Sequence, residues 1–125
     1  MILGLGLDLT QIERVRGLIE RRGERAVQRL FTAGERAYCE RKKDKFASYA
    51  GRFAVKEAVM KLLGTGWARG VRWVDIEVAR APGEAPRVLL HGETARIAQR
   101  KGIARIHITI THDAGIAAAV AVAEN

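Results

Sequence analysis

The chain has 125 residues, of which 48% are hydrophobic, so it is long enough for one hydrophobic core and too short for two comfortable domains. Lys and Arg number 22 against 14 Asp and Glu, and the net charge of +8 favours an acidic or phosphate-bearing partner. The single cysteine, Cys39, excludes an internal disulfide and a zinc site made of several thiols, and it suggests a reducing, cytoplasmic setting. We therefore expect one domain over residues 1–125.

In chain order, the spacing of apolar residues predicts a strand, three helices, two strands, a helix and two strands. The strands are expected over residues 2–7, 71–78, 87–91, 105–111 and 116–123. The helices are expected over residues 10–23, 32–40, 46–63 and 92–102. Because hairpins join the later strands, this order favours an α+β fold with a mainly antiparallel sheet. The apolar runs are much shorter than the ~20 residues of a membrane-spanning helix, so no membrane partner is expected.

Local signals mark where several elements begin and end. Gly23 follows the apolar residues of the first helix and is interpreted as its C-terminal cap. Thr32 and Glu35 have the spacing of a capping box, which predicts the start of the second helix. The third helix is apolar on most sides, so it should be central to the fold. In the strand that follows it, Asp75 is expected on the polar side.

Two carboxylates stand out as candidates for chemistry. Glu57 lies on an apolar face of the third helix, where a carboxylate must be paired, protonated or bound to a cation. One alternative is an intrahelical pair with Lys61, worth ~0.2–0.5 kcal/mol on an exposed helix. Asp8 ends the first strand, and its alternative role is to cap the helix that follows. Together, Asp8 and Glu57 would suit Mg²⁺, which commonly takes one or two protein carboxylates with phosphate oxygens and water.

Other motifs give weaker signals. The glycines of "GTG", residues 64–66, follow a helix C-terminus and are interpreted as caps, and a phosphate near them would need positive charge from Lys61, Lys56 or Arg52. His112 lies at a predicted hairpin turn, where a lone histidine is more often a surface residue than a catalyst. "GLGLDL" lacks the third glycine of a dinucleotide fingerprint, and nothing matches a P-loop. Ser48 has no nucleophile-elbow context, which argues against a serine triad.

Several stretches resemble the holo-[acyl-carrier-protein] synthases, the small bacterial phosphopantetheinyl transferases. They are "GLGLDLTQIERV", "LFTAGERAYC", "YAGRFAVKEAVMKLLGTG", "VDIEV" and "ITITHDAGIAAAVAV", in the family's order and at about its spacing. The most specific elements are the G-x-D strand end and the R-F-A-x-K-E-A-x-x-K helix. Thr109 and Thr111 stand where the family more often has serines.

The resemblance implies a Mg²⁺-dependent transfer of 4′-phosphopantetheine from coenzyme A to a serine of apo-acyl carrier protein, in support of fatty acid biosynthesis. Adenosine 3′,5′-bisphosphate would be released. By analogy, Asp8 and Glu57 hold the metal, and Lys61 neutralises the same phosphates. Arg52 and His112 would contact the phosphate end of the nucleotide. Glu57 as general base is an alternative that the sequence does not separate from metal ligation.

The resemblance also implies partners. The family forms a homotrimer with each active site at a subunit boundary. Arg14, Arg21 and Arg22 lie on the outward face of the first helix and would meet an acidic helix of the carrier protein. The alternative is a small basic nucleic-acid-binding domain, but aromatic residues make up only 6% and do not form a base-stacking platform. A structural oligomerisation module would leave Asp8 and Glu57 without a purpose.

Overall fold

The computed structural model describes all 125 residues and contains five strands, four α-helices and one short 3₁₀ helix. The strands are β1 (Ile2–Gln11), β2 (Ile76–Ala79), β3 (Arg87–Leu90), β4 (Arg105–Asp113) and β5 (Ile116–Glu124). The helices are α1 (Ile12–Leu30), α2 (Ala33–Glu40), α3 (Lys45–Leu63) and α4 (Gly92–Arg100), and the 3₁₀ helix is η1 (Trp73–Asp75). The predicted α+β class is therefore confirmed. No helix has the length and hydropathy needed to cross a membrane.

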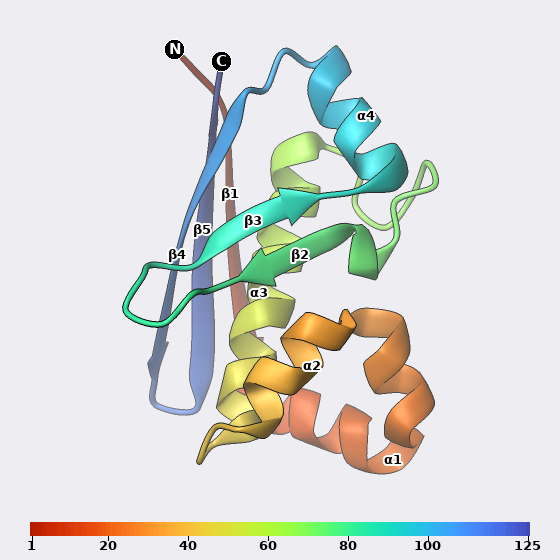
Figure 1. The fold of residues 1–125 in the computed structure, drawn as a ribbon, viewed down its shortest axis with the longest axis vertical. Coiled ribbons are helices and arrows are strands. Elements are labelled where there is room, and N and C mark those ends of the chain that lie inside the picture. Colours follow the sequence, from red (N-terminus) through yellow and green to blue (C-terminus); the bar gives the residue numbers. More distant parts are fainter.

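One antiparallel sheet has the strand order β1-β5-β4, and β2 and β3 form a separate antiparallel pair. All four helices lie on one side of the three-stranded sheet (Figure 1). Because side chains alternate along a strand, Asp8 and Thr10 of β1 are buried on the helix side, while Leu5 and Leu7 point away from it. The sheet thus has one covered face and one apolar face that nothing in the chain covers.

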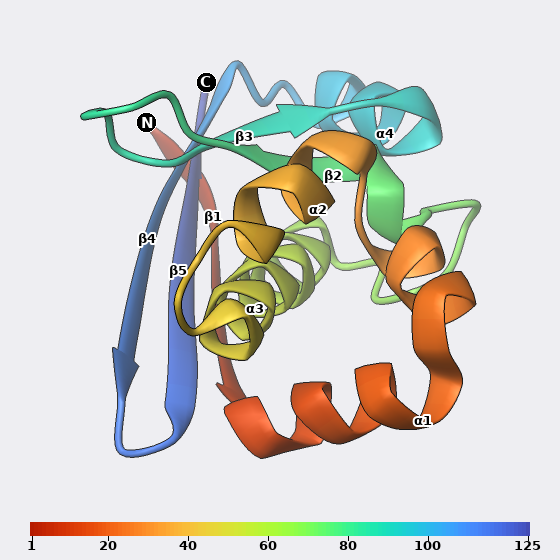
Figure 2. The same ribbon diagram turned by 60° about the horizontal axis from the view of Figure 1, so that its bottom comes forward.

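The central helix is α3, as the sequence predicts. It contacts β1, β5, α1 and α2, and Figure 2 shows it running across the inner face of the sheet. Its closest approach is at Gly6 of β1, where a Cβ atom would lie 1.8 Å from the carbonyl oxygen of Ala58. Only glycine allows this contact. The absence of a side chain at residue 6 therefore sets α3 against β1 and brings Glu57 over Asp8.

A buried ion pair fastens α2 to α3. Lys56 Nζ lies 2.8 Å from Glu35 Oε1, and both side chains are completely buried. Lys56 also donates to the carbonyl oxygens of Trp73 and Ile76, and Glu35 accepts a hydrogen bond from the Val78 amide. All of these bonds lie within the core. The interpretation of Lys56 as a possible phosphate ligand is therefore wrong, and Lys56 is a structural residue.

The helical turns that begin at Ile12 stop at Gly23, as the sequence predicts, because Gly23 has a non-helical backbone with a positive φ of 69° and kinks the chain. What the sequence does not predict is the second helical segment after this kink, which continues to Leu30 as part of α1. Val27 and Leu30 of the second half are buried in a core cluster with Phe31 and Tyr49. Packing of these apolar side chains therefore stabilises a second helical segment that the local signals do not indicate.

The strand predicted over residues 71–78 is shorter in the structure. Residues 73–75 form η1, and β2 begins only at Ile76. Asp75, which was expected on the polar side of the strand, is 2% exposed and accepts hydrogen bonds from Arg72 at 2.9 and 3.2 Å. Its backbone oxygen also accepts the amide of His91. These contacts explain why the alternating pattern does not form a strand at this point.

Candidate active site

Asp8, Glu57 and Lys61 meet where α3 crosses β1. Asp8 is 7% exposed, and Lys61 Nζ lies 3.2 Å from its Oδ1 atom. Lys61 also donates to the carbonyl oxygen of Leu7 at 3.0 Å. Lys61 thus pairs across to the strand, and not along the helix with Glu57 as the intrahelical alternative requires. The N-cap of α1 is Gln11, so the alternative of Asp8 as a helix cap is wrong too.

The two carboxyl groups are neighbours. Partial burial of Glu57 raises its pKa, and the adjacent charge and hydrogen bond of Asp8 raise it further, while Arg14 and Lys61 lower it. No cationic side chain forms an ion pair with Glu57, whereas Asp8 has Lys61. Two carboxyl groups therefore lie side by side, with the Lys61 ammonium group on Asp8 and the Arg14 charge near Glu57, and such a pair can hold an added cation.

This donor set fits Mg²⁺. Asp8 and Glu57 supply hard carboxylate oxygens, and no third Asp, Glu, His or Cys joins them. Mg²⁺ is commonly held by one or two carboxylates and fills its remaining positions with water and phosphate oxygens. A zinc site would need three or four protein ligands. Asp8 and Glu57 are thus the residues that would hold the metal.

Thr10 belongs to this cluster, and the sequence reasoning missed it. Its Oγ1 donates a hydrogen bond to Asp8 Oδ2 at 2.7 Å, and the side chain is 2% exposed. The predicted strand ended at residue 7, whereas β1 continues to Gln11. Extending the strand alternation by one step would have placed Thr10 on the same face as Asp8.

Arg52 and His112 lie together at a second place, beside the loop between α2 and α3. They line a hollow of about 270 Å³. Its lining residues are Tyr38, Lys42, Lys43, Asp44, Ala47, Ser48, Arg52, Arg80 and His112. His112 is within β4 and not at the hairpin turn as expected, and its Nε2 donates to the carbonyl oxygen of Ala47 at 2.8 Å. This bond fixes the imidazole against the first turn of α3.

The lining of the hollow is strongly basic, which favours binding of an anion. Arg52 is 5% exposed, its guanidinium lies over the ring of Tyr38 at 4.1 Å, and its Nε atom is buried without a hydrogen-bond partner. Burial raises the pKa of Tyr38, but hydrogen bonds and charges from Lys42 and Arg52 outweigh this and lower it. The only acidic residue in the lining is Asp44, which caps α3. The lining therefore offers the positive charges of Lys42, Lys43, Arg52 and Arg80 to an anion.

The structure does not bring these two groups into one pocket. Asp8 lies in β1 and His112 in β4, and β5 separates these two strands. None of Asp8, Glu57 and Lys61 lines the basic hollow. The chain therefore carries an acidic cluster with a lysine and, apart from it, a basic hollow.

Comparisons with known proteins show the family to which the chain belongs. Residues 4–121 match the family model described as the 4′-phosphopantetheinyl transferase superfamily. A holo-[acyl-carrier-protein] synthase of Solibacter usitatus is 49% identical over 125 residues, which cover 100% of both chains. The chain belongs to the holo-[acyl-carrier-protein] synthase family. The resemblance and the enzyme class expected from the sequence are thereby confirmed.

Solved structures of the same family share the fold. The holo-[acyl-carrier-protein] synthase of Neisseria meningitidis is 26% identical, covers 100% of both chains and has a TM-score of 0.90. The Helicobacter pylori holo-[acyl-carrier-protein] synthase, solved in complex with coenzyme A, is 31% identical and has a TM-score of 0.84, with 96% of this chain and 99% of that chain covered. Nothing in these relatives favours the alternative of a nucleic-acid-binding domain.

In this synthase, the three arginines predicted on α1 are exposed. Arg14 lies close enough to Glu57 for its charge to lower the Glu57 pKa. Arg22 lines a groove of about 750 Å³ between the two halves of α1 and the loop after α3. The other residues of the groove are Leu18, Arg25, Ala26, Arg29, Leu30, Trp67 and Trp73. The groove combines apolar and basic side chains, which suits an acidic partner with apolar contact residues.

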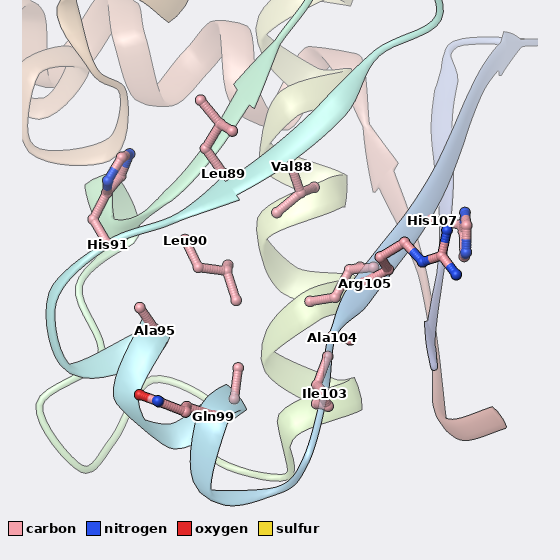
Figure 3. Close-up of a pocket in the computed structure, with 12 residues that line it drawn as sticks. Val88, Leu89, Leu90, His91, Ala95, Gln99, Ile103, Ala104, Arg105 and His107 are labelled. Carbon is pink, nitrogen blue, oxygen red and sulfur yellow. The ribbon is translucent and has the colours of Figure 1, made fainter. Parts of the chain in front are cut away.

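Another hollow of the synthase lies between β3, α4 and β4 and measures about 500 Å³ (Figure 3). Its lining is mainly aliphatic and includes Val88, Leu90 and Ile103. None of the residues predicted for the active site lines it. The acidic cluster and the basic hollow, and not this aliphatic cavity, are therefore the candidate active site.

Proposed function

We propose that this holo-[acyl-carrier-protein] synthase transfers 4′-phosphopantetheine from coenzyme A to a serine of apo-acyl carrier protein and requires Mg²⁺. The observation that carries the proposal is the pair of carboxylates beside Lys61, together with a separate basic hollow for the phosphate end of the nucleotide. The coenzyme A complex of the Helicobacter pylori relative supports coenzyme A as the donor. We place the enzyme in the cytoplasm, where it would serve fatty acid biosynthesis as a single catalytic domain.

The reaction forms one bond and breaks one bond at phosphorus. The serine oxygen attacks the phosphorus that carries the pantetheine, and the bond from this phosphorus to the bridging oxygen of the pyrophosphate breaks. Adenosine 3′,5′-bisphosphate leaves with that oxygen. The serine proton must also be removed, and a positioned carboxylate can accept it.

Asp8 and Glu57 have different roles in this proposal. Both oxygens of Asp8 already accept hydrogen bonds, from Thr10 and from Lys61, so Asp8 is suited to hold a metal in a fixed position. Glu57 forms no ion pair, and its raised pKa makes it the better proton acceptor. When bound, Mg²⁺ would neutralise charge on the pyrophosphate. Lys61 supplies a second positive charge from one turn further along α3.

We further propose a homotrimer in which the acidic cluster of one copy combines with the basic hollow of the next copy to form one active site. Leu5, Leu7 and Leu9 are 66%, 58% and 64% exposed on the uncovered face of the sheet. An apolar face of this kind is typical of a subunit interface, because full burial of a leucine side chain contributes about 1.5–3 kcal/mol. A closed ring of three copies would bring the acidic cluster on β1 of one copy to the basic hollow beside β4 of the next.

Lys61→Met should weaken coenzyme A binding by about tenfold and change folding little. It removes the charge but keeps an apolar stem of similar length, and Lys61 is 56% exposed. Calorimetric titration with coenzyme A and thermal unfolding measure the two effects. Unchanged affinity with a large loss of thermal stability would return Lys61 to a structural role.

Arg14→Glu should raise the KM for carrier protein by about tenfold or more and leave coenzyme A affinity nearly unchanged. The exposed Arg14 lies on the face that we propose meets the acidic carrier helix, and charge complementarity acts mainly on association. The salt dependence of kcat/KM should also flatten. Wild-type carrier kinetics of this variant at low salt would show that the face is only solvated surface.

The reaction can be tested through its small product. Coenzyme A, Mg²⁺ and a bacterial apo-acyl carrier protein are incubated with the enzyme, and adenosine 3′,5′-bisphosphate is quantified by chromatography. We expect one product molecule per carrier molecule, and none without carrier or with the metal removed by chelation. Product that forms equally without carrier would mean hydrolysis, and it would contradict the proposal.

A further inference from the structure

Thr10 is a buried hydroxyl at a position where an apolar residue would pack equally well. It lies on β1 opposite Ala117 and faces the helix side of the sheet. Burying a hydroxyl has a free-energy cost unless the hydroxyl forms a hydrogen bond. Its single donor proton goes to Asp8 Oδ2, at 2.7 Å. The contact with Asp8 therefore explains why a polar residue occupies this place.

The geometry leaves Asp8 little freedom. Thr10 and Asp8 are two residues apart on one strand, so their side chains stand on the same face. Thr10 holds Oδ2, and Lys61 lies 3.2 Å from Oδ1, so the two oxygens of Asp8 are held from opposite sides. A β-branched residue such as threonine has a restricted χ1 angle, which makes Thr10 a stiff support. Thr10 thus fixes the plane of the Asp8 carboxylate.

We propose that Thr10 is the positioning residue that orients Asp8 for binding a divalent cation; this rests on the proposed function, in which Asp8 and Glu57 hold Mg²⁺. By holding Oδ2, the Thr10 hydroxyl fixes the orientation in which the Asp8 carboxylate, which Lys61 contacts at Oδ1, would meet the cation. Hydrogen bonds to metal ligands of this kind typically change metal affinity by about 10–100-fold when they are removed. Thr10 itself touches neither the metal nor the substrate.

The test measures metal binding without catalysis. Mn²⁺ is titrated into the full-length protein, and free Mn²⁺ is followed by electron paramagnetic resonance. Thr10→Val keeps the shape of the side chain and removes the hydroxyl, whereas Thr10→Ser keeps the hydroxyl. We expect the Mn²⁺ Kd to rise by about 10–100-fold for Thr10→Val and to stay within about threefold of wild type for Thr10→Ser. In an Asp8→Asn background, Thr10→Val should have no further effect.

The outcomes separate this proposal from the proposed function. Wild-type affinity in Thr10→Val would overturn the role of Thr10, whether or not the enzyme transfers phosphopantetheine. If Thr10→Val does not fold, Thr10→Ser decides, because loss of Mn²⁺ binding with the hydroxyl present would also overturn it. A wild-type protein that binds no Mn²⁺ would overturn the metal assignment and the role of Thr10 together. A wild-type protein that binds Mn²⁺ but gives no transfer would contradict only the proposed function.

Discussion

Glu57→Gln and Asp8→Asn should each lower the rate of phosphopantetheine transfer by about 10³-fold while the protein stays folded. Each substitution removes one charged metal ligand with little change in volume, and Glu57→Gln also removes the proposed proton acceptor. Loss of a single group that stabilises developing charge typically costs about 10²–10³ in rate, and the loss of a metal ligand should be at the upper end of this range. Steady-state kinetics at saturating coenzyme A measures the effect.

Thermal unfolding in the absence of metal gives the control. Burial and the neighbouring Asp8 raise the pKa of Glu57, so its ionisation opposes folding, and stability falls as pH rises from the ordinary pKa of a glutamate through the raised pKa. Glu57→Gln should therefore leave Tm unchanged or raise it slightly at neutral pH. Glu93, whose pKa is lowered by Arg96 and Arg100, is the matched carboxylate. Glu93→Gln should keep activity without raising Tm, and near-normal transfer by Glu57→Gln at limiting Mg²⁺ would refute the metal assignment.

Leu5→Asp should prevent trimer formation and reduce transfer by about 100-fold or more. In the single chain Leu5 is 66% exposed, so the aspartate costs little folding stability there. In the proposed interface it would bury an unpaired charge, which is strongly unfavourable. Light scattering and the transfer assay at the same protein concentration measure the two effects. Trp67→Asp changes an equally exposed apolar residue away from the sheet and should leave the oligomeric state unchanged.

A mixing experiment distinguishes a shared site from a site within one chain. Glu57→Gln impairs the acidic cluster, and Arg52→Gln impairs the basic hollow. If each active site combines two copies, an equimolar mixture of these two variants should regain roughly a quarter of wild-type activity after random association, because about one site in four pairs two intact parts. Mixed trimers without activity, or an active Leu5→Asp monomer, would mean that the site is complete within one chain.

The sequence predicts the acidic cluster well, because strand and helix periodicity are local properties. Asp8 at the end of an apolar strand and Glu57 on an apolar helix face are both unusual, and Lys61 follows Glu57 by one helical turn. What the local pattern does not contain is the partner of each residue. The i,i+4 spacing suggests a Glu57–Lys61 pair, whereas close packing at Gly6 brings Lys61 to Asp8 instead.

The basic hollow depends on tertiary contacts, and the sequence predicts it only in part. Arg52 and His112 are far apart in the chain and meet because β4 packs beside the first turns of α3. Tyr38 and Lys42 complete the hollow, but the sequence places Tyr38 only in a short helix and Lys42 only in the charged loop that follows it. For Lys56 the prediction itself is wrong. The sequence allows Lys56 to bind a phosphate, but its side chain lies in the core with Glu35.

Intact-mass spectrometry of the carrier protein tests the proposed reaction most directly. A bacterial apo-acyl carrier protein is incubated with this enzyme, coenzyme A and Mg²⁺, alongside the Glu57→Gln enzyme and a carrier that lacks the acceptor serine. We expect the carrier to gain the mass of one phosphopantetheine group with the wild-type enzyme, and to gain nothing in either control. A carrier of unchanged mass after incubation with the folded, coenzyme A-bound wild-type enzyme would contradict phosphopantetheine transfer.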